Sequence, residues 1–312
     1  MFRFQKDTKT GKKIIRVLVT LLSIIIVIFL IFQNKDDFFE AFRRLPLGII
    51  LLIVLLAFLS RVTVTIRWFV LVKAVEPQVT FKNIFKLSFL GLFTTNVLPT
   101  TIGGDLVKFS AGVQKGLDPA HLAGSLVFDR LIGLATMFTF LPFGIIQFLQ
   151  MNVSQTDITM LNLLGVIPNL WRKGLLFLRK TWRSMRHWFN KPYHLLIAVL
   201  LSYLHMFFTF SIVYLILLGL SDPVPWLIVG GLWVIVYFIT LIPISINSFG
   251  LQEVSLSFVF QSLAGITVAN SLVLAVIVRL IFIIASLPGA FFLPDVFSKM
   301  PQKGALNNEQ KI

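Results

Sequence analysis

Charged side chains recur inside otherwise apolar stretches of this sequence, and they are the residues whose chemistry is hardest to explain as ordinary surface. Eight ionisable residues lie within or beside such stretches, namely Arg61, Arg67, Asp105, Lys108, Asp129, Arg130, Glu253 and Arg279. A charge at the centre of a membrane helix costs about 2.5–3.5 kcal/mol. Several such charges predict an internal polar site in which cations attract a phosphate and carboxylates hold those cations. The alternative is that the charges form ion pairs that only fasten helices together.

Four of these eight residues lie on or next to two interruptions in the apolar pattern. The first interruption runs from Asn96 through Pro99 to Gly103, Gly104 and Asp105. Proline removes a backbone donor, the glycine pair permits unusual backbone shapes, and Asp105 is placed to cap a helix that starts at Leu106. We therefore expect a re-entrant region over about residues 83–115, because irregular backbone at membrane depth survives only inside protein or beside a wet cavity.

The second interruption has a similar composition. Pro243 is followed by Asn247, Gly250 and Glu253, which predicts a second re-entrant region over about residues 244–265. Broken helices build substrate sites in many transporters, since free helix N-termini attract anions. The similarity suggests an internal duplication, although the spacing from proline to glycine is four residues in the first interruption and seven in the second.

The composition shows which elements must position these residues. Of 312 residues, 57% are apolar and 13% are charged, whereas a soluble domain is about 25% charged. This excludes an ordinary water-soluble enzyme. We expect an all-α polytopic membrane protein with about six to eight transmembrane helices, two broken or re-entrant elements and one basic interfacial helix. Residues 17–294 would form a single membrane domain in the cell membrane.

The ends of the chain are polar. Residues 1–16 contain six Lys and Arg residues against one acid, and an uncharged run over residues 17–32 follows. This pattern resembles a signal peptide, but the run is long and has no small-residue cleavage pattern, which favours an uncleaved anchor with a cytoplasmic N-terminus. Residues 295–312 read as a polar tail.

A strongly basic segment lies in the middle of the chain. Residues 171–192 contain no acid and interleave tryptophan and phenylalanine with cations, among them Arg172, Lys173, Arg179, Lys180, Arg183 and Arg186. The apolar residues follow the three-four spacing of one helical face. We expect an amphipathic helix on the membrane surface that contacts anionic lipids, and no nucleic acid as a partner, because membrane spans flank this segment.

Neighbouring charges on one helix face different directions. Asp129 and Arg130 point about 100° apart, so each needs a partner elsewhere. Arg67 either extends to the cytoplasmic interface or belongs to the internal site. His205, alone on a predicted span, is expected to form a hydrogen bond between helices.

Enzyme signatures are missing from the sequence. There is no phosphate-binding glycine loop with its lysine, no HExxH, no G-x-S-x-G and no D-x-D pair, and the four histidines do not pair at metal-ligand spacing. Cysteine is absent. We expect no catalytic residues, no metal and no cofactor.

Several of these segments together resemble the lysylphosphatidylglycerol synthase/flippase transmembrane family. The resemblance rests on residues 67–71, 96–99, 103–108, 129–134 and 243–253, and on Arg279 in the last predicted helix. It implies the fold of that family's membrane domain, which is linked to moving modified phospholipids between leaflets, and in archaeal relatives to polyprenyl-phosphate-sugar translocation.

Two departures from the family pattern concern the headgroup. Gln252 precedes the signature Glu where relatives usually have Arg, and position 108 is Lys where Arg is common. Lysine lacks the planar fork that suits phosphate oxygens. The chain also ends without a soluble aminoacyl-transfer domain, so it is not expected to make lysylphosphatidylglycerol.

Three functions remain open on the sequence. The leading hypothesis is a lipid flippase or scramblase whose site comprises Asn96, Pro99, Gly103, Gly104, Asp105, Lys108, Asp129, Arg130, Asn247, Gly250, Glu253 and Arg279. Its partners would be phospholipids, anionic ones first, or polyprenyl-phosphate lipids. The alternatives are a polyprenyl-phosphate glycosyltransferase and a non-transporting partner of a lipid-modifying enzyme.

Overall fold

Helices make up all the regular structure in the part of the chain that the structure describes. The computed structural model describes residues 4–98, 103–152, 190–242, 245 and 247–294. Pro99, the basic segment over residues 171–189 and the tail over residues 295–312 lie outside the described residues.

The elements follow one another with short connections. They are α1 (Phe4–Gln33), α2 (Lys35–Arg44), α3 (Leu47–Val75), α4 (Phe81–Val97), α5 (Gly103–Gln114), α6 (Pro119–Phe138), α7 (Leu141–Asn152), α10 (Pro192–Gly219), α11 (Trp226–Thr240), α12 (Leu251–Ala264), α13 (Val268–Ser286) and the 3-10 helix η1 (Leu287–Phe292).

Four of the described helical stretches are long and apolar enough to cross a membrane. They cover Leu47–Val75, Pro119–Gln150, Pro192–Gly219 and Val268–Phe292, and shorter apolar helices cover Thr20–Gln33 and Trp226–Thr240. The all-helical, multi-pass membrane fold predicted from the composition is confirmed. Six to eight transmembrane helices stays a prediction.

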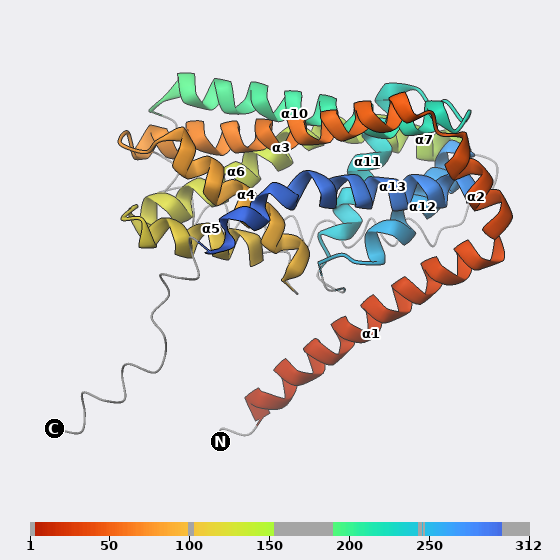
Figure 1. Ribbon diagram of the computed structural model, residues 1–312, viewed down its shortest axis with the longest axis horizontal. Coiled ribbons are helices and arrows are strands. Elements are labelled where there is room, and N and C mark those ends of the chain that lie inside the picture. The colour runs from red at the N-terminus through yellow and green to blue at the C-terminus, as the bar shows by residue number, and fades with distance from the viewer. Residues whose placement is uncertain (1–3, 99–102, 153–189, 243–244, 246, 295–312) are drawn as a thin grey trace.

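The long helices pack lengthwise. α3 lies beside α10 over most of its length, and α13 passes through the middle of the bundle between the α4–α5 region and α12 (Figure 1). α1 extends away from the other helices and meets α12 and α13 only near its C-terminal half (Figure 1). Its large apolar side chains, Phe29 and Phe32 among them, are exposed, as expected for side chains that face lipid.

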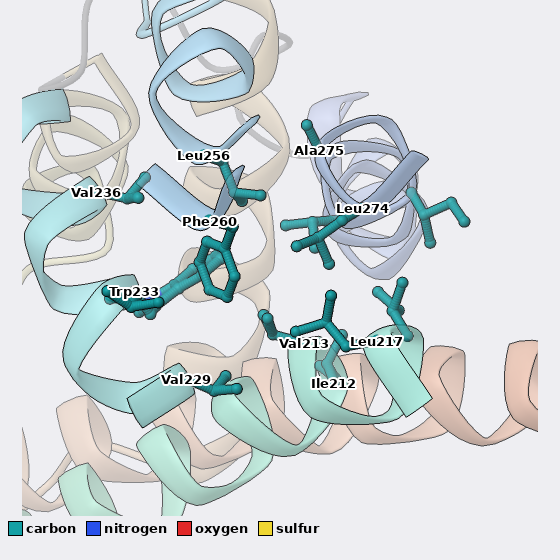
Figure 2. Close-up of a cluster of buried hydrophobic side chains, with 14 of the residues drawn as sticks. Ile212, Val213, Leu217, Val229, Trp233, Val236, Leu256, Phe260, Leu274 and Ala275 are labelled. Carbon is teal, nitrogen blue, oxygen red and sulfur yellow. The ribbon is translucent and has the colours of Figure 1, made fainter. Parts of the chain in front are cut away.

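The main apolar core lies where α10, α11, α12 and α13 meet. Figure 2 shows Phe260 of α12 among Trp233 of α11, Val213 of α10 and Leu274 of α13. Phe260, Val213 and Leu274 are fully buried, so this core packs α11 and α12, which flank the second interruption, against α10 and α13.

Small residues allow two helices to touch through their backbones. A methyl group added to Gly231 of α11 would overlap the backbone of Gly144 in α7. Close approach through small residues is a common way for membrane helices to associate, because it increases van der Waals contact. α7 and α11 therefore contact each other through their backbones at this point.

Both predicted interruptions break a helix, but the boundaries differ from expectation. α5 starts at Gly103, so Asp105 lies in its first turn and does not cap a helix that begins at Leu106. α11 ends at Thr240, before the region of about residues 244–265 in which the second re-entrant element was expected. Residues 247–250 form a turn that leads into α12.

Candidate functional site

The first interruption brings three charged side chains together. Asp105, in the first turn of α5, accepts hydrogen bonds from Arg130 of α6, with Nε and Nη2 each 2.6 Å from Oδ2. The Nζ of Lys108 lies 3.6 Å from the other oxygen, Oδ1. Two cations share one carboxylate, so this cluster has one net positive charge.

Close contact between α4 and α5 positions Lys108. A methyl group on Gly104 would overlap the Thr95 hydroxyl and the Gly91 carbonyl, and one on Gly91 would lie 2.5 Å from the Lys108 Cε. The Lys108 side chain therefore packs directly against Gly91, where any larger residue would collide with it. Its Nζ lies 5.1 Å from the centre of the Trp68 ring. Of Gly103 and Gly104, the two glycines predicted for this site, Gly104 makes the close contact between α4 and α5.

Asp129 turns away from Arg130 and binds Arg67 of α3. The Arg67 Nε and Nη2 donate to the two Asp129 oxygens at 2.7 and 2.8 Å, and Nη1 donates to the Ser202 Oγ of α10 at 2.9 Å. All three residues are buried. The prediction that Asp129 and Arg130 need separate partners is confirmed, and Arg67 is an internal residue and does not extend to the interface.

The second interruption has a strained backbone. Asn247, Ser248 and Gly250 have φ angles of 48°, 57° and 74°, a region that only glycine adopts without cost. A methyl group on Gly250 would overlap the Ser23 side chain of α1 and lie 2.8 Å from the Ile24 nitrogen. Packing of α1 against this turn helps to fix the strained conformation.

A second ion pair follows directly. Glu253, in the first turn of α12, accepts a hydrogen bond from the Arg279 Nε of α13, and Arg279 Nη2 donates to the Ser248 carbonyl at 3.1 Å. The guanidinium also covers the Phe249 ring at 4.6 Å. The other Glu253 oxygen, Oε2, is buried without a hydrogen-bond partner among the described residues.

Asn96 serves a different contact from the charged residues. Its side-chain nitrogen donates to the Ser286 Oγ at 2.7 Å, which joins the end of α4 to the end of α13. The structure thus places Gly103, Gly104, Asp105, Lys108 and Arg130 in one cluster and Gly250, Glu253 and Arg279 in another. Asn247 contributes a buried, strained turn to the second cluster.

The two clusters repeat one arrangement. The sequence separation is 25 residues from Asp105 to Arg130 and 26 from Glu253 to Arg279. In each segment a glycine with positive φ, Gly116 or Gly265, follows the end of the helix after the break.

The helix that comes next starts in the same way in both segments. The N-cap residue, Asp118 or Thr267, accepts from the backbone nitrogen three residues later, and Arg130 and Arg279 each lie twelve residues beyond it. The order α4–α5–α6 thus matches α11–α12–α13 through the caps as well as the charges.

The sequence did not single out several residues that support these clusters. Ser202 and Ser248 hydrogen-bond arginines, and Trp68 and Phe249 lie against cations. Ser202, His205 and Thr209 are spaced three and four residues apart and so share one face of α10. This sequence pattern predicts a polar contact between α10 and another helix.

The polar contact between α3 and α10 continues beyond Arg67. His205 Nδ1 lies 2.8 Å from the Ser60 Oγ, which confirms the predicted hydrogen bond between helices. Among the described residues, no three histidine or acidic side chains gather as a metal site.

The comparison with protein families agrees with these motifs. The family described as the lysylphosphatidylglycerol synthase TM region matches residues 14–289, a range that includes both breaks and both clusters. No curated protein matches the chain. Since the match covers most of the sequence, the chain belongs to the lysylphosphatidylglycerol synthase transmembrane-region family, a membrane domain linked to lipid modification and translocation.

Proposed function

We propose that this protein is a lipid flippase or scramblase in which the two helix breaks line a polar path for a lipid headgroup. The substrate would be a phospholipid, anionic ones first, or a polyprenyl-phosphate lipid in the cell membrane. No covalent step is part of the proposal, and a lipid-synthesising enzyme could supply the substrate.

One observation supports the proposal most directly. A carboxylate stands in the first turn of a helix that begins after a break, paired with an arginine of a neighbouring long helix, and this arrangement occurs twice. Helix N-termini favour anions. A carboxylate in that place occupies a position that a headgroup phosphate can take when the pair opens.

The first cluster is suited to such an exchange. The Arg130 side chain is 48% exposed and the Asp105 side chain 23%, and Lys108 adds a second cation. A partly exposed ion pair contributes only about 0–1 kcal/mol, so a phosphate can displace the carboxylate at little cost. The net positive charge of the cluster favours an anionic group over a neutral one.

The alternative is that the ion pairs only hold helices together. Measuring stability alongside lipid movement distinguishes the two roles. A fastener whose removal leaves the protein folded should leave lipid movement unchanged. A residue on the path should alter movement even when stability is retained.

Reconstitution tests the proposal. We would place the purified protein in liposomes that contain headgroup-labelled lipids of anionic, zwitterionic and cationic type, and quench the outer leaflet. Wild-type protein should expose the protected inner pool. Asp105→Asn and Glu253→Gln should protect that pool again, with thermal unfolding in detergent confirming that each variant is folded.

Asp37→Asn is the matched control, because Asp37 is an exposed first-turn acid of α2, away from both breaks. It should leave lipid movement intact. If the folded Asp105→Asn and Glu253→Gln variants moved lipid at the wild-type rate, the path would lie elsewhere. If wild-type protein exposed no lipid of any headgroup, the flippase function would be wrong.

A further inference from the structure

Arg61 differs from the other arginines of the long apolar helices. The helices α3, α6 and α13 contain four arginines, and three of them, Arg67, Arg130 and Arg279, bind carboxylates. Arg61 lies midway along α3, fourteen residues from either end, and no carboxylate in the described part of the chain pairs with it.

The guanidinium of Arg61 is buried on one side and unsatisfied there. Its Nε is inaccessible and has no hydrogen-bond partner within the described ranges, while the residue as a whole stays partly accessible. The guanidinium carbon lies 4.4 Å from the centre of the Phe282 ring of α13. The group therefore points inward to a neighbouring helix.

An uncompensated charge in this place has an energetic consequence. Removing a guanidinium from water without a counter-ion is costly, and a cation–π contact offsets only a part of that cost. The three other arginines show how this chain normally compensates such a charge. Arg61 lacks that compensation in the described part of the chain, so its guanidinium still has the capacity to bind an anion.

The position of Arg61 relative to the breaks indicates which anion. Along α13, Arg279 binds Glu253 after the second break, Phe282 meets Arg61, and Ser286 binds Asn96 before the first break. Residues three and four apart lie on one helix face, and the seven residues from Arg279 to Ser286 span about 10 Å. Arg61 thus stands between the two breaks.

We propose that Arg61 binds the phosphate of a lipid headgroup as the headgroup passes between the two breaks. The inference rests on the proposed function and makes it more specific, because it names the residue that binds the phosphate which both proposed substrate classes share. The planar guanidinium donates two parallel hydrogen bonds to phosphate oxygens, and the nitrogens other than Nε are the ones left to do so.

The test compares lipids with and without phosphate. Liposomes would contain labelled phosphatidylglycerol or a labelled glycosyl diacylglycerol of the same chain length. Because Arg61→Gln removes hydrogen bonds to a charged partner, it should slow phosphatidylglycerol movement by about tenfold or more. It should not slow the glycolipid. Arg61→Lys keeps the charge but loses the planar fork of donors. It should move phosphatidylglycerol at a rate between those of wild-type protein and Arg61→Gln.

Arg43→Gln on α2 is the matched control, because Arg43 is an exposed arginine outside both clusters. It should behave as wild type with both lipids. If Arg61→Gln slowed both lipids equally, or neither, Arg61 would not be the phosphate ligand.

A binding measurement separates this inference from the proposed function. Short-chain phosphatidylglycerol in detergent should raise the Tm of wild-type protein and of Arg43→Gln but not of Arg61→Gln; if Arg61→Gln fails to fold, a reduced shift in Arg61→Lys makes the same point. An Arg61-dependent Tm shift in a protein that moves no lipid would support the phosphate site while the flippase function fails. If the protein moves lipid but neither the movement nor the Tm shift depends on Arg61, the flippase function would stand and the Arg61 phosphate site would be wrong. An equal Tm shift from inorganic phosphate would identify a soluble anion as the occupant and overturn the lipid assignment.

Discussion

The two clusters use the same pair of charges in different surroundings. At the first break, the Arg130 side chain is 48% exposed, whereas at the second break the Glu253 and Arg279 side chains are 10% and 15% exposed. The second pair is also backed by the Ser248 carbonyl and the Phe249 ring. The repeated arrangement therefore gives a partly exposed ion pair at the first break and a largely buried one at the second.

This difference separates two tasks. An exposed pair can exchange its partner with little loss of stability, while a buried pair cannot be opened without leaving a charge in an apolar interior. We infer that both pairs lie on the proposed headgroup path, that the first opens more readily to incoming headgroups, and that the second also holds α12 against α13. The following experiments test that division, starting with the largest expected effect.

Removing one partner of the buried pair should be the most damaging change. Arg279→Met leaves Glu253 charged and buried, and should lower the free energy of unfolding by about 3–5 kcal/mol. Arg130→Met at the exposed pair should cost about 1 kcal/mol or less. Denaturant-induced unfolding in detergent micelles measures both.

A double variant serves as the control for this prediction. Glu253→Leu with Arg279→Met removes both charges and should recover most of the lost stability, since apolar replacements of a buried pair are often neutral. Should the double variant be as unstable as Arg279→Met alone, the loss would come from packing and the division between the pairs would fail.

Glycine contacts at both breaks should be intolerant of a side chain, and Gly250 more so because of its positive φ. Gly104→Ala forces α4 and α5 apart, and Gly250→Ala must displace α1 and adopt a strained φ. Overpacking costs about 1–3 kcal/mol. Thermal unfolding of the two variants checks this, with Gly48→Ala as a control because no described atom lies within 4 Å of a methyl group there. A wild-type Tm for Gly104→Ala would mean that the α4–α5 contact can relax.

The helix-ending glycines test the repeat itself. Gly116 and Gly265 have φ angles of 83° and 71°, and an alanine methyl group at either position would have no described atom within 4 Å. Alanine should therefore add only the penalty of a left-handed backbone, which lowers the free energy of unfolding by about 1–2 kcal/mol. The loss should be the same at both positions. Unequal losses in parallel unfolding experiments would show that the two segments are similar in outline only.

The smallest effect is expected at the end of α4. Asn96→Ala removes the hydrogen bond to Ser286, and hydrogen bonds between membrane helices average about 0.6 kcal/mol. A double-mutant cycle with Ser286→Ala should give a coupling energy of that size. A coupling near zero would show that the α4–α13 contact does not depend on this bond.

The sequence predicted the positions of the breaks but not the partners of their charges. Proline and glycine next to an acid are local signals, and both breaks lie where these residues occur. The pairing of Arg67 with Asp129 depends on the packing of α3 against α6, 62 residues apart in the chain, which no local pattern encodes. For the same reason, the sequence alone leaves Arg67 open to an interfacial interpretation.

The repeat is visible only in part from the sequence. The differing spacing from proline to glycine obscures it, whereas Gly116 with Asp118 and Gly265 with Thr267 are spaced identically. These residues do not stand out, because single turn residues are common in any loop. Their meaning depends on the caps and φ angles that the structure provides.

The contact between Gly144 and Gly231 limits how this protein can change shape. Because the two backbones lie in direct contact at this point, neither glycine leaves room for a side chain, and a shift of α7 against α11 has to break or compress the contact. In the proposed function, a rearrangement that admits a headgroup therefore has to keep α7 and α11 together.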